Sequence, residues 1–214
     1  MTQLSEHLAL ALVEEGARLS PLDRAVRLHA ALAGVGVGEA AQVAVDERDR
    51  TLLAARRARF GARAEFVARC PECELQVESE LDLDALLATR GEPDETVRAP
   101  TSREVSEAAR AGDVSALLKL CRRDDAIDVA EVEARLEKAH PLLDIAIALE
   151  CPDCAHRFEE RFEIARYLWI ELERETGTVL DEVHILARSY GWSEEQILAL
   201  GPRRRRAYID RIAA

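Results

Sequence analysis

Four of the five cysteines lie in two short motifs of one pattern, Cys70-Pro71-Glu72-Cys73 and Cys151-Pro152-Asp153-Cys154. In a CxxC turn, two thiolates can bind one metal ion while backbone N–H groups of the turn point at the sulfurs. Two such turns together supply the four ligands that a tetrahedral Zn²⁺ site requires. We therefore predict one structural zinc site, with Cys70, Cys73, Cys151 and Cys154 as its ligands.

The distance between the two motifs is unusual for such a site. A simple zinc ribbon has roughly 15–20 residues between its CxxC turns, whereas here residues 74–150 separate them. The predicted ribbon is therefore split by a long insertion. Glu74 and Ala155 follow the second cysteine of each motif, where a glycine often permits the turn. Both residue types tolerate a positive φ poorly, so the sequence does not decide whether the two turns adopt the usual left-handed conformation.

Other interpretations of the cysteines are weaker. Reduced thiols without a metal are the main alternative. Two disulfides are disfavoured because we recognise no secretory signal in residues 1–7 and expect a cytoplasmic protein, whose thiols stay reduced. A thioredoxin-like motif would need a CxxC between a strand and a helix, which neither segment suggests. His156 lies two residues after Cys154 and could replace one thiolate as a ligand.

The segments on both sides of each motif alternate between apolar and polar residues. Such alternation is typical of a strand with one buried face. It predicts two hairpins whose tips hold the ion, with apolar positions at Phe66, Leu75, Val77, Leu81 and Leu83 in the first and Ile145, Ile147, Leu149, Phe158, Phe162 and Ile164 in the second.

The rest of the chain has the spacing and end signals of helices. Ser20-Pro21-Leu22-Asp23 combines a capping serine, a first-turn proline and an acidic third position, and we expect Gly34, Gly36 and Gly38 to form a linker after that helix. A further helix is predicted from Asp49 to Phe60, ending at Gly61. The segment from Gly91 to Pro100 is rich in proline and acidic residues and is expected to be an exposed connection.

Capping boxes at Thr101–Glu104 and Ser193–Gln196 predict two more helix starts. Another helix is expected from Ala130 to Ala139, and Cys121 is expected to be a buried thiol on an apolar helix face. The clearest helical stripe comprises Leu168, Leu172, Val179, Val183, Leu186 and Tyr190, with Gly177 as its weak point and Gly191 as its end.

These patterns together predict an α+β, predominantly helical fold built around a split zinc ribbon with four cysteine ligands. We expect an N-terminal helical region over 1–65, the ribbon over 66–90 and 141–165, a helical insertion over 91–140, and a C-terminal helical region over 166–214.

Composition restricts the function. The 214 residues carry 41 acidic and 29 basic side chains, a net charge of −12, which disfavours nucleic acid as the main partner because phosphate binding relies on Lys and Arg. The exception is the run Arg203 to Arg206 near the C-terminus, and such a run is more often a solvated helix face or a contact for an acidic partner than a nucleic-acid site. No apolar run approaches the about 18 residues of a membrane span.

No combination of residues marks a known catalytic mechanism. The five histidines are scattered, and none is spaced from a Ser, Cys or carboxylate as in a known active site. A closed four-cysteine zinc site also leaves no position for a substrate. We therefore expect a non-enzyme. Trp192, at the bend after Gly191, is expected to be a packing residue or, if exposed, a partner anchor.

The C-terminal segment from Leu180 to Leu200, which contains Tyr190-Gly191-Trp192-Ser193, resembles proteins of contractile phage tails and phage-tail-like injection systems, as does the following run from Arg203 to Tyr208. The segment from Glu47 to Gly61 and the two CPxC motifs fit the same resemblance. The chain is thus similar, over most of its length, to the T4-type phage baseplate protein family, described as baseplate hub subunits or hub assembly chaperones.

The resemblance implies a binding role. Such a protein would bind hub or spike components in the cytoplasm, where baseplates assemble, and either leave or stay in the finished particle. Tyr190, Trp192, Arg203, Arg204, Arg205 and Arg206 would then be candidates for the partner surface. The family has no catalytic residue to transfer. Two alternatives remain at this point, a zinc-ribbon module that binds nucleic acid or the transcription machinery, and a zinc-dependent enzyme.

Overall fold

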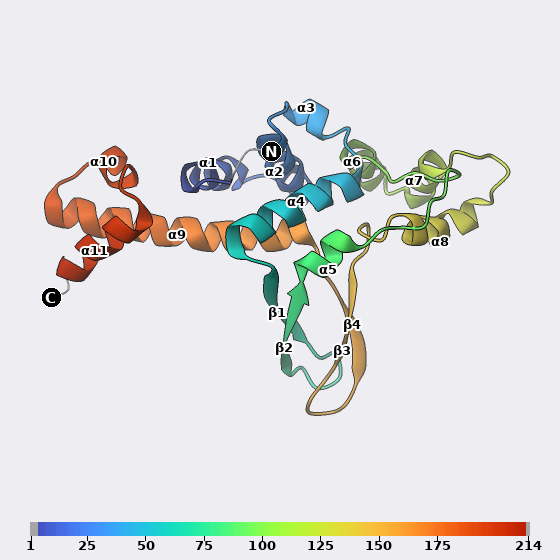
Figure 1. Ribbon diagram of the computed structural model, residues 1–214. Coiled ribbons are helices and arrows are strands. Elements are labelled where there is room, and N and C mark those ends of the chain that lie inside the picture. Colours follow the sequence, from blue (N-terminus) through green and yellow to red (C-terminus); the bar gives the residue numbers. More distant parts are fainter. Residues whose placement is uncertain (1–3, 213–214) are drawn as a thin grey trace. The chain divides into compact units, whose positions relative to one another are not determined.

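The computed structural model describes residues 4–212 and is mostly helical, with two small antiparallel sheets (Figure 1). The described chain divides into two compact units. Unit 1 comprises residues 19–168, and unit 2 comprises residues 4–18 together with 169–212. Among the described residues, no helix has both the length and the apolar character needed to cross a membrane.

Unit 1 begins with three helices whose ends follow from local sequence. The Ser20 side chain accepts from the backbone N–H of Asp23, and Gly34 ends the helix in a left-handed conformation at φ 73°. Both signals were predicted. The Gly-rich linker is partly helical, however, because a short helix begins at Val37. These helices are α2 (Pro21–Ala33), α3 (Val37–Ala40) and α4 (Val45–Phe60).

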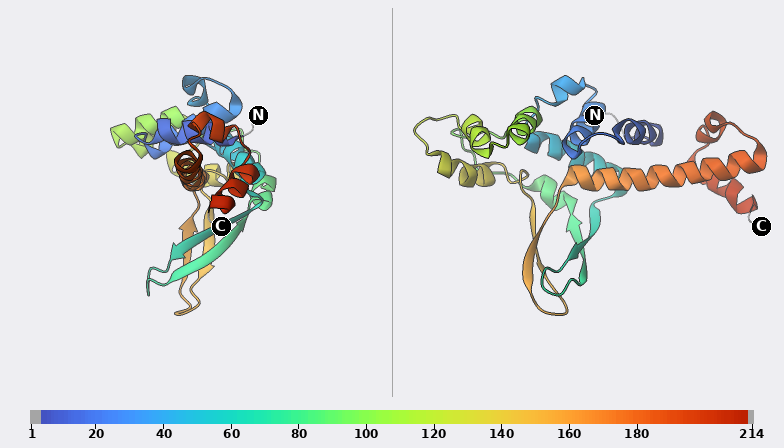
Figure 2. Two further views of the ribbon diagram at one scale, coloured as in Figure 1. Left: turned by 90° about the vertical axis from the view of Figure 1, so that its left-hand side faces the viewer. Right: turned by 180° about the vertical axis from the view of Figure 1, so that it is seen from behind.

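Two separate two-stranded hairpins follow, on either side of the helical insertion. The first pairs β1 (Arg63–Arg69) with β2 (Gln76–Asp82), and the second pairs β3 (Ala146–Glu150) with β4 (Arg157–Arg161). Each CPxC motif is the loop that joins the two strands of its hairpin. The hairpins run alongside each other with their loops at the same end, as Figures 1 and 2 both show. The predicted position of the cysteines at hairpin tips is therefore correct.

The insertion between the hairpins has a core of its own, formed by Val97, Cys121, Ile127, Val132 and Leu136. The predicted capping box is present at the start of α6, with both of its hydrogen bonds. The helices of this part are α5 (Leu83–Ala88), α6 (Ser102–Ala111), α7 (Val114–Cys121) and α8 (Val129–Ala139).

The prediction that the segment from Gly91 to Pro100 is an exposed connection is wrong for its second half. Val97 is 2% exposed and forms an isolated β-bridge with Arg122. The backbone N–H of Arg98 also donates to the Cys121 carbonyl at 2.8 Å. Polar composition suggested a solvent-exposed segment, but pairing with residues more than twenty positions away buries it.

Unit 2 is built around a 27-residue helix, α9 (Ile164–Tyr190), whose first turn belongs to unit 1. Gly191 follows it at φ 69°. Gly16, the last residue of α1 (Glu6–Gly16), lies so close to the Trp169 ring that an added Cβ would fall 2.0 Å from it. The remaining helices are α10 (Glu194–Leu198), which starts with the predicted capping box, and α11 (Pro202–Ile212).

Candidate metal centre

The four predicted cysteine ligands converge at the tips of the two hairpins. Their sulfur atoms all lie within 4.8 Å of one another. The Sγ–Sγ distance is 3.6 Å between Cys70 and Cys154 and 3.5 Å between Cys73 and Cys151. Zinc–thiolate bonds of about 2.3 Å in a tetrahedron place sulfurs about 3.8 Å apart. The donor set therefore fits one thiophilic metal ion, and both short contacts join sulfurs of different hairpins.

The two turns have the same backbone hydrogen bonds. In the first, the Glu74 N–H donates to the Cys70 carbonyl and the Cys70 N–H donates to the Leu75 carbonyl, both at 2.9 Å. The second turn repeats both bonds, from the Ala155 N–H to the Cys151 carbonyl at 3.0 Å and from the Cys151 N–H to the His156 carbonyl at 2.9 Å. One local conformation thus presents both pairs of sulfurs.

The conformation requires a left-handed residue after each second cysteine. Glu74 has φ 61° and Ala155 has φ 56°, and among residues 4–212 no other residue besides glycines has a positive φ. The sequence left it open whether these residues could adopt the turn. They adopt it in both motifs, which indicates that sulfur placement outweighs the local backbone cost.

Backbone N–H groups make the turns suitable for thiolates. Donation from the N–H of Cys154, and then from that of Asp153, lowers the pKa of the Cys151 thiol to about 7, against the opposing effect of partial burial. For Cys73, the Leu75 N–H acts in the same direction, but partial burial and hydrogen bonds with the other three cysteines raise its pKa to about 12. Four crowded thiols cannot all ionise unless a cation balances their charge, which is what a divalent metal would supply.

Burial divides the four ligands into two classes. Cys70 and Cys151, the first cysteine of each motif, are buried against Val77 and Phe158, whereas Cys73 and Cys154 are exposed. The His156 ring stacks on the Phe158 ring, with centroids 6.3 Å apart. The cluster of metal-binding groups comprises the four cysteines and does not include His156.

Aromatic rings also join the two hairpins away from their tips, and the sequence did not predict this contact. The Phe162 ring lies 6.5 Å from the Phe66 ring and 5.1 Å from the Tyr167 ring, centroid to centroid. The Tyr167 hydroxyl donates to the Glu65 carbonyl at 2.6 Å. The two hairpins are therefore connected at two places, by aromatic packing between the middle of β1 and the end of β4 and by the cysteine cluster at the tips. No local pattern predicts contacts between residues so far apart in the chain.

The fifth cysteine is not part of the cluster. Cys121 is 1% exposed and belongs to the core of the insertion, as the sequence predicted. Burial raises the pKa of its thiol to about 11, so it stays protonated at neutral pH.

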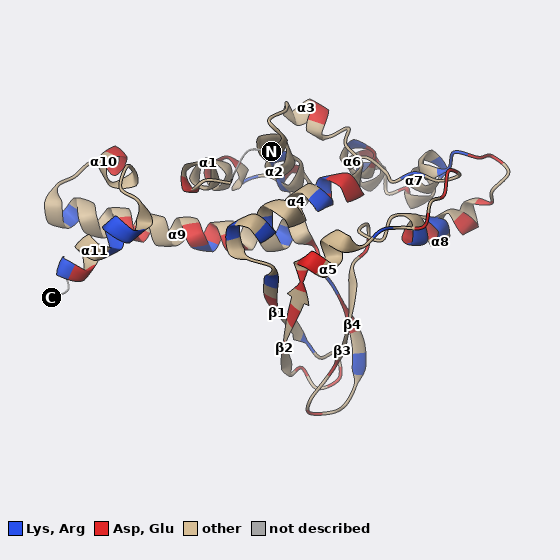
Figure 3. Cartoon of the chain, in the orientation of Figure 1, with Lys and Arg blue, Asp and Glu red and all other residues tan. Residues whose placement is uncertain are grey.

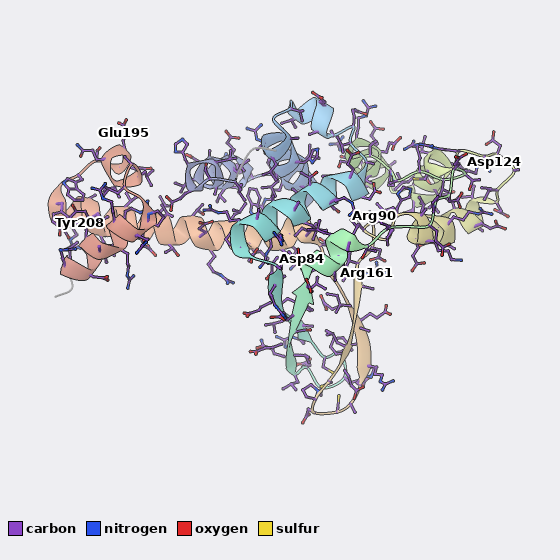
Figure 4. All side chains as sticks on the ribbon, viewed as in Figure 1. Asp84, Arg90, Asp124, Arg161, Glu195 and Tyr208 are labelled. Atoms are coloured by element: carbon purple, nitrogen blue, oxygen red, sulfur yellow. The ribbon has the colours of Figure 1, made fainter. Side chains whose placement is uncertain are left out.

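The predicted partner-binding residues lie together in unit 2. Tyr190 and Trp192 stack at 4.7 Å, and Tyr208, labelled on α11 in Figure 4, contacts both rings edge-on. Tyr190 is 40% exposed. The aromatic cluster thus packs internally and leaves part of its surface accessible.

The arginine run does not form a uniform surface. Arg203, Arg204 and Arg206 are exposed on α11, where Figure 3 shows the basic residues in blue. Arg205 is 1% exposed and is bound by two carboxylates, Glu6 at 2.5 Å and Glu182 at 2.6 Å. Arg205 is therefore buried inside unit 2, and only its three neighbours are available to a partner.

Comparisons with protein-family models, with curated proteins and with solved structures find no match to this chain. The described residues present a four-cysteine cluster that could hold a metal ion at the tips of two hairpins.

Proposed function

We propose that the four cysteines hold one structural zinc ion and that the two hairpins form the halves of a split zinc ribbon. The near-tetrahedral spacing of the sulfurs and the matched turns support this assignment. Zinc is the usual metal of closed four-thiolate sites in proteins. With all four positions taken by sulfur, the ion would stabilise the fold without binding a substrate.

On this basis, the chain is a non-enzymatic assembly factor or hub component of the baseplate of a contractile phage tail-like injection system. The proposal rests on the resemblance of the segment from Leu180 to Leu200 to baseplate proteins. Its main structural support is the closed cysteine site, because such a site would serve to position surfaces for a partner rather than to perform a reaction.

The proposed partner surface consists of the aromatic cluster Tyr190, Trp192 and Tyr208 with the exposed Arg203, Arg204 and Arg206. Aromatic residues and arginines dominate the binding energy of many protein interfaces. Partially exposed rings that are already packed together lose little conformational freedom on binding. Hub or spike proteins with an acidic and apolar surface would complement this set.

Co-purification tests the proposal. The tagged chain, co-expressed with hub and spike proteins of a contractile tail-like particle, is expected to retain at least one of them, and Trp192→Ala should weaken that capture about tenfold or more. Val114→Ala serves as a matched control, because Val114 is 69% exposed in unit 1, far along the chain from these residues. Normal assembly of intact particles in cells that lack the protein would contradict an assembly role.

The alternative, a zinc-ribbon module for nucleic acid, is less well supported by the charge. With a net charge of −12, the chain would bind phosphate backbones only through a local basic surface. Titration with DNA and RNA at moderate salt separates the two ideas. Binding that falls steeply with salt and is lost in Arg203→Glu and Arg204→Glu would favour the alternative.

A further inference from the structure

One face of α9 in unit 2 has an internal symmetry that the proposed function does not use. Between positions 170 and 185, six residues on this face are exposed, and two of them are isoleucines that are 45% and 36% exposed. At about 100° per residue, all six fall within an arc of about 100° on the helix. We call this set the α9 stripe; it comprises Ile170, Arg174, Gly177, Thr178, Asp181 and Ile185.

The stripe has the same spacing when read from either end. Its outer positions are isoleucines, its central pair is small, and its intermediate positions are Arg174 and Asp181, which carry opposite charges. In an antiparallel pairing of two such helices about an axis between Gly177 and Thr178, each isoleucine would face an isoleucine. Arg174 of each copy would face Asp181 of the other copy, which gives two ion pairs related by the two-fold axis. A parallel pairing would place like charges together.

The charges of the stripe have no partners within the described chain. No ion pair involves the side chain of Arg174 or Asp181 among residues 4–212. The two residues are about 10 Å apart along the helix axis, at about 1.5 Å per residue, too far for a direct ion pair with each other. A second copy would satisfy both charges, which makes the surface complementary to itself.

Gly177 supplies an independent observation. A glycine inside a helix costs roughly 1 kcal/mol relative to alanine. The chain's own packing does not require it, since an added Cβ would meet no atom within 4 Å and its φ is not positive. A glycine at the centre of a helix face allows another helix backbone to approach closely. Gly177 therefore lies where a helix from another molecule could pack closely against α9.

We propose that the α9 stripe binds a second copy of this chain as an antiparallel helix pair. From Ile170 to Ile185 the contact would extend over about 22 Å of helix. This is small beside the roughly 800 Å² per partner of a standard interface. We therefore expect a weak dimer that forms only at high protein concentration.

Charge reversal provides a sharp test by sedimentation equilibrium of the zinc-loaded full chain, over micromolar to several hundred micromolar concentrations. Asp181→Arg and Arg174→Asp should each raise the dimer dissociation constant about tenfold or more, because each places like charges in contact. An equimolar mixture of the two variants should restore association, since each reversed charge then faces its complement. Glu14→Arg, the same charge change on an exposed residue of α1, should have no effect.

Gly177→Leu separates binding from folding. Leucine has the higher helix propensity, so the thermal midpoint should not fall, while the larger side chain should abolish the dimer. The proposal is overturned if the wild type is monomeric at every concentration, if each reversal variant still associates like the wild type, or if the mixture fails to restore association. The last result, with each variant alone monomeric, would show that Arg174 and Asp181 do not face each other across the dimer.

Discussion

At the residue scale, the most unusual backbone belongs to Glu74 and Ala155. Their left-handed conformation costs about 1–2 kcal/mol for a residue with a Cβ and is imposed by the placement of the sulfurs. Glycine adopts the same conformation without this cost but loses more entropy on folding. The backbone cost that glycine avoids is larger than the extra entropy it loses, so glycine at either position should make the folded protein more stable.

We accordingly expect Glu74→Gly and Ala155→Gly each to raise the free energy of unfolding of the zinc-loaded protein by about 0.5–1 kcal/mol. Urea unfolding measures the change. Glu78→Gly is the matched control, because Glu78 lies in β2 without a positive φ, so glycine should lower stability there. A loss of stability at both turn positions would show that the turns are not strained.

At the scale of single elements, the start of α6 depends on one carboxylate. Glu104 accepts from the Arg98 guanidinium at 2.6 and 2.9 Å and from the Thr101 N–H at 2.8 Å. The hydrogen bond from Arg98, followed by that from the Thr101 backbone, lowers the pKa of Glu104 from 4.5 to about 2 against the effect of burial. The ionised form is therefore stabilised by folding.

The lowered pKa of Glu104 sets the direction in which its contribution to stability changes with pH. A lowered pKa in the folded state gives stability that is fully present above the unfolded value of 4.5 and is lost as pH falls through about 2. Glu104→Gln should cost about 1–3 kcal/mol at pH 7, and the difference from wild type should shrink below pH 4.5. Glu107→Gln, in the same helix but 62% exposed at its side chain, should change stability little at any pH. A pH-independent difference for Glu104→Gln would contradict this account.

Helix ends were the best predicted part of the fold, because each depends on residues within one turn. The caps at Ser20, Thr101 and Ser193 and the stop at Gly191 are as expected. The start of α4 was misplaced, at Asp49 instead of Val45, because its capping residue makes no side-chain hydrogen bond. A helix start without a cap leaves no local signal.

Long-range features were predicted only where chemistry made them recognisable. Four matched cysteines could be assigned to one cluster, because a metal site needs all of them. The ring contact between Phe66 and Phe162 and the burial of Val97 have no such signature. They depend on which apolar surfaces meet after the chain has folded. For the same reason, the sequence did not distinguish the buried Arg205 from its exposed neighbours.

At the scale of the whole molecule, unit 2 depends on Arg205, which connects α11 to Glu6 at the start of α1 and to Glu182 on α9. Removing one member of a buried charge network leaves the others unpaired, at a cost of about 3–5 kcal/mol. Arg205→Gln should therefore lower the thermal midpoint strongly, whereas Arg206→Gln should have little effect because Arg206 is exposed. Equal midpoints for the two variants would contradict the assigned role of Arg205.

The two units should respond differently to metal removal. Both tryptophans of the chain, Trp169 and Trp192, belong to unit 2, while the four clustered cysteines belong to unit 1. If the four cysteines hold a metal, a strong chelator is expected to release it and expose the four thiols to a thiol reagent, with little change in tryptophan emission. A large shift of the emission on chelation would show that unit 2 also depends on the metal.

The central claim is that one zinc ion joins the two hairpins through four thiolates. Metal analysis combined with X-ray absorption of the purified protein tests it most directly. One zinc ion per chain is expected, bound by four sulfurs at about 2.3 Å. The metal should be kept in Cys121→Ala and lost in Cys70→Ser or Cys151→Ser, which should also unfold readily, since structural zinc contributes on the order of 10 kcal/mol. A protein without metal, or a Cys70→Ser variant with unchanged metal content and thermal midpoint, would contradict the account.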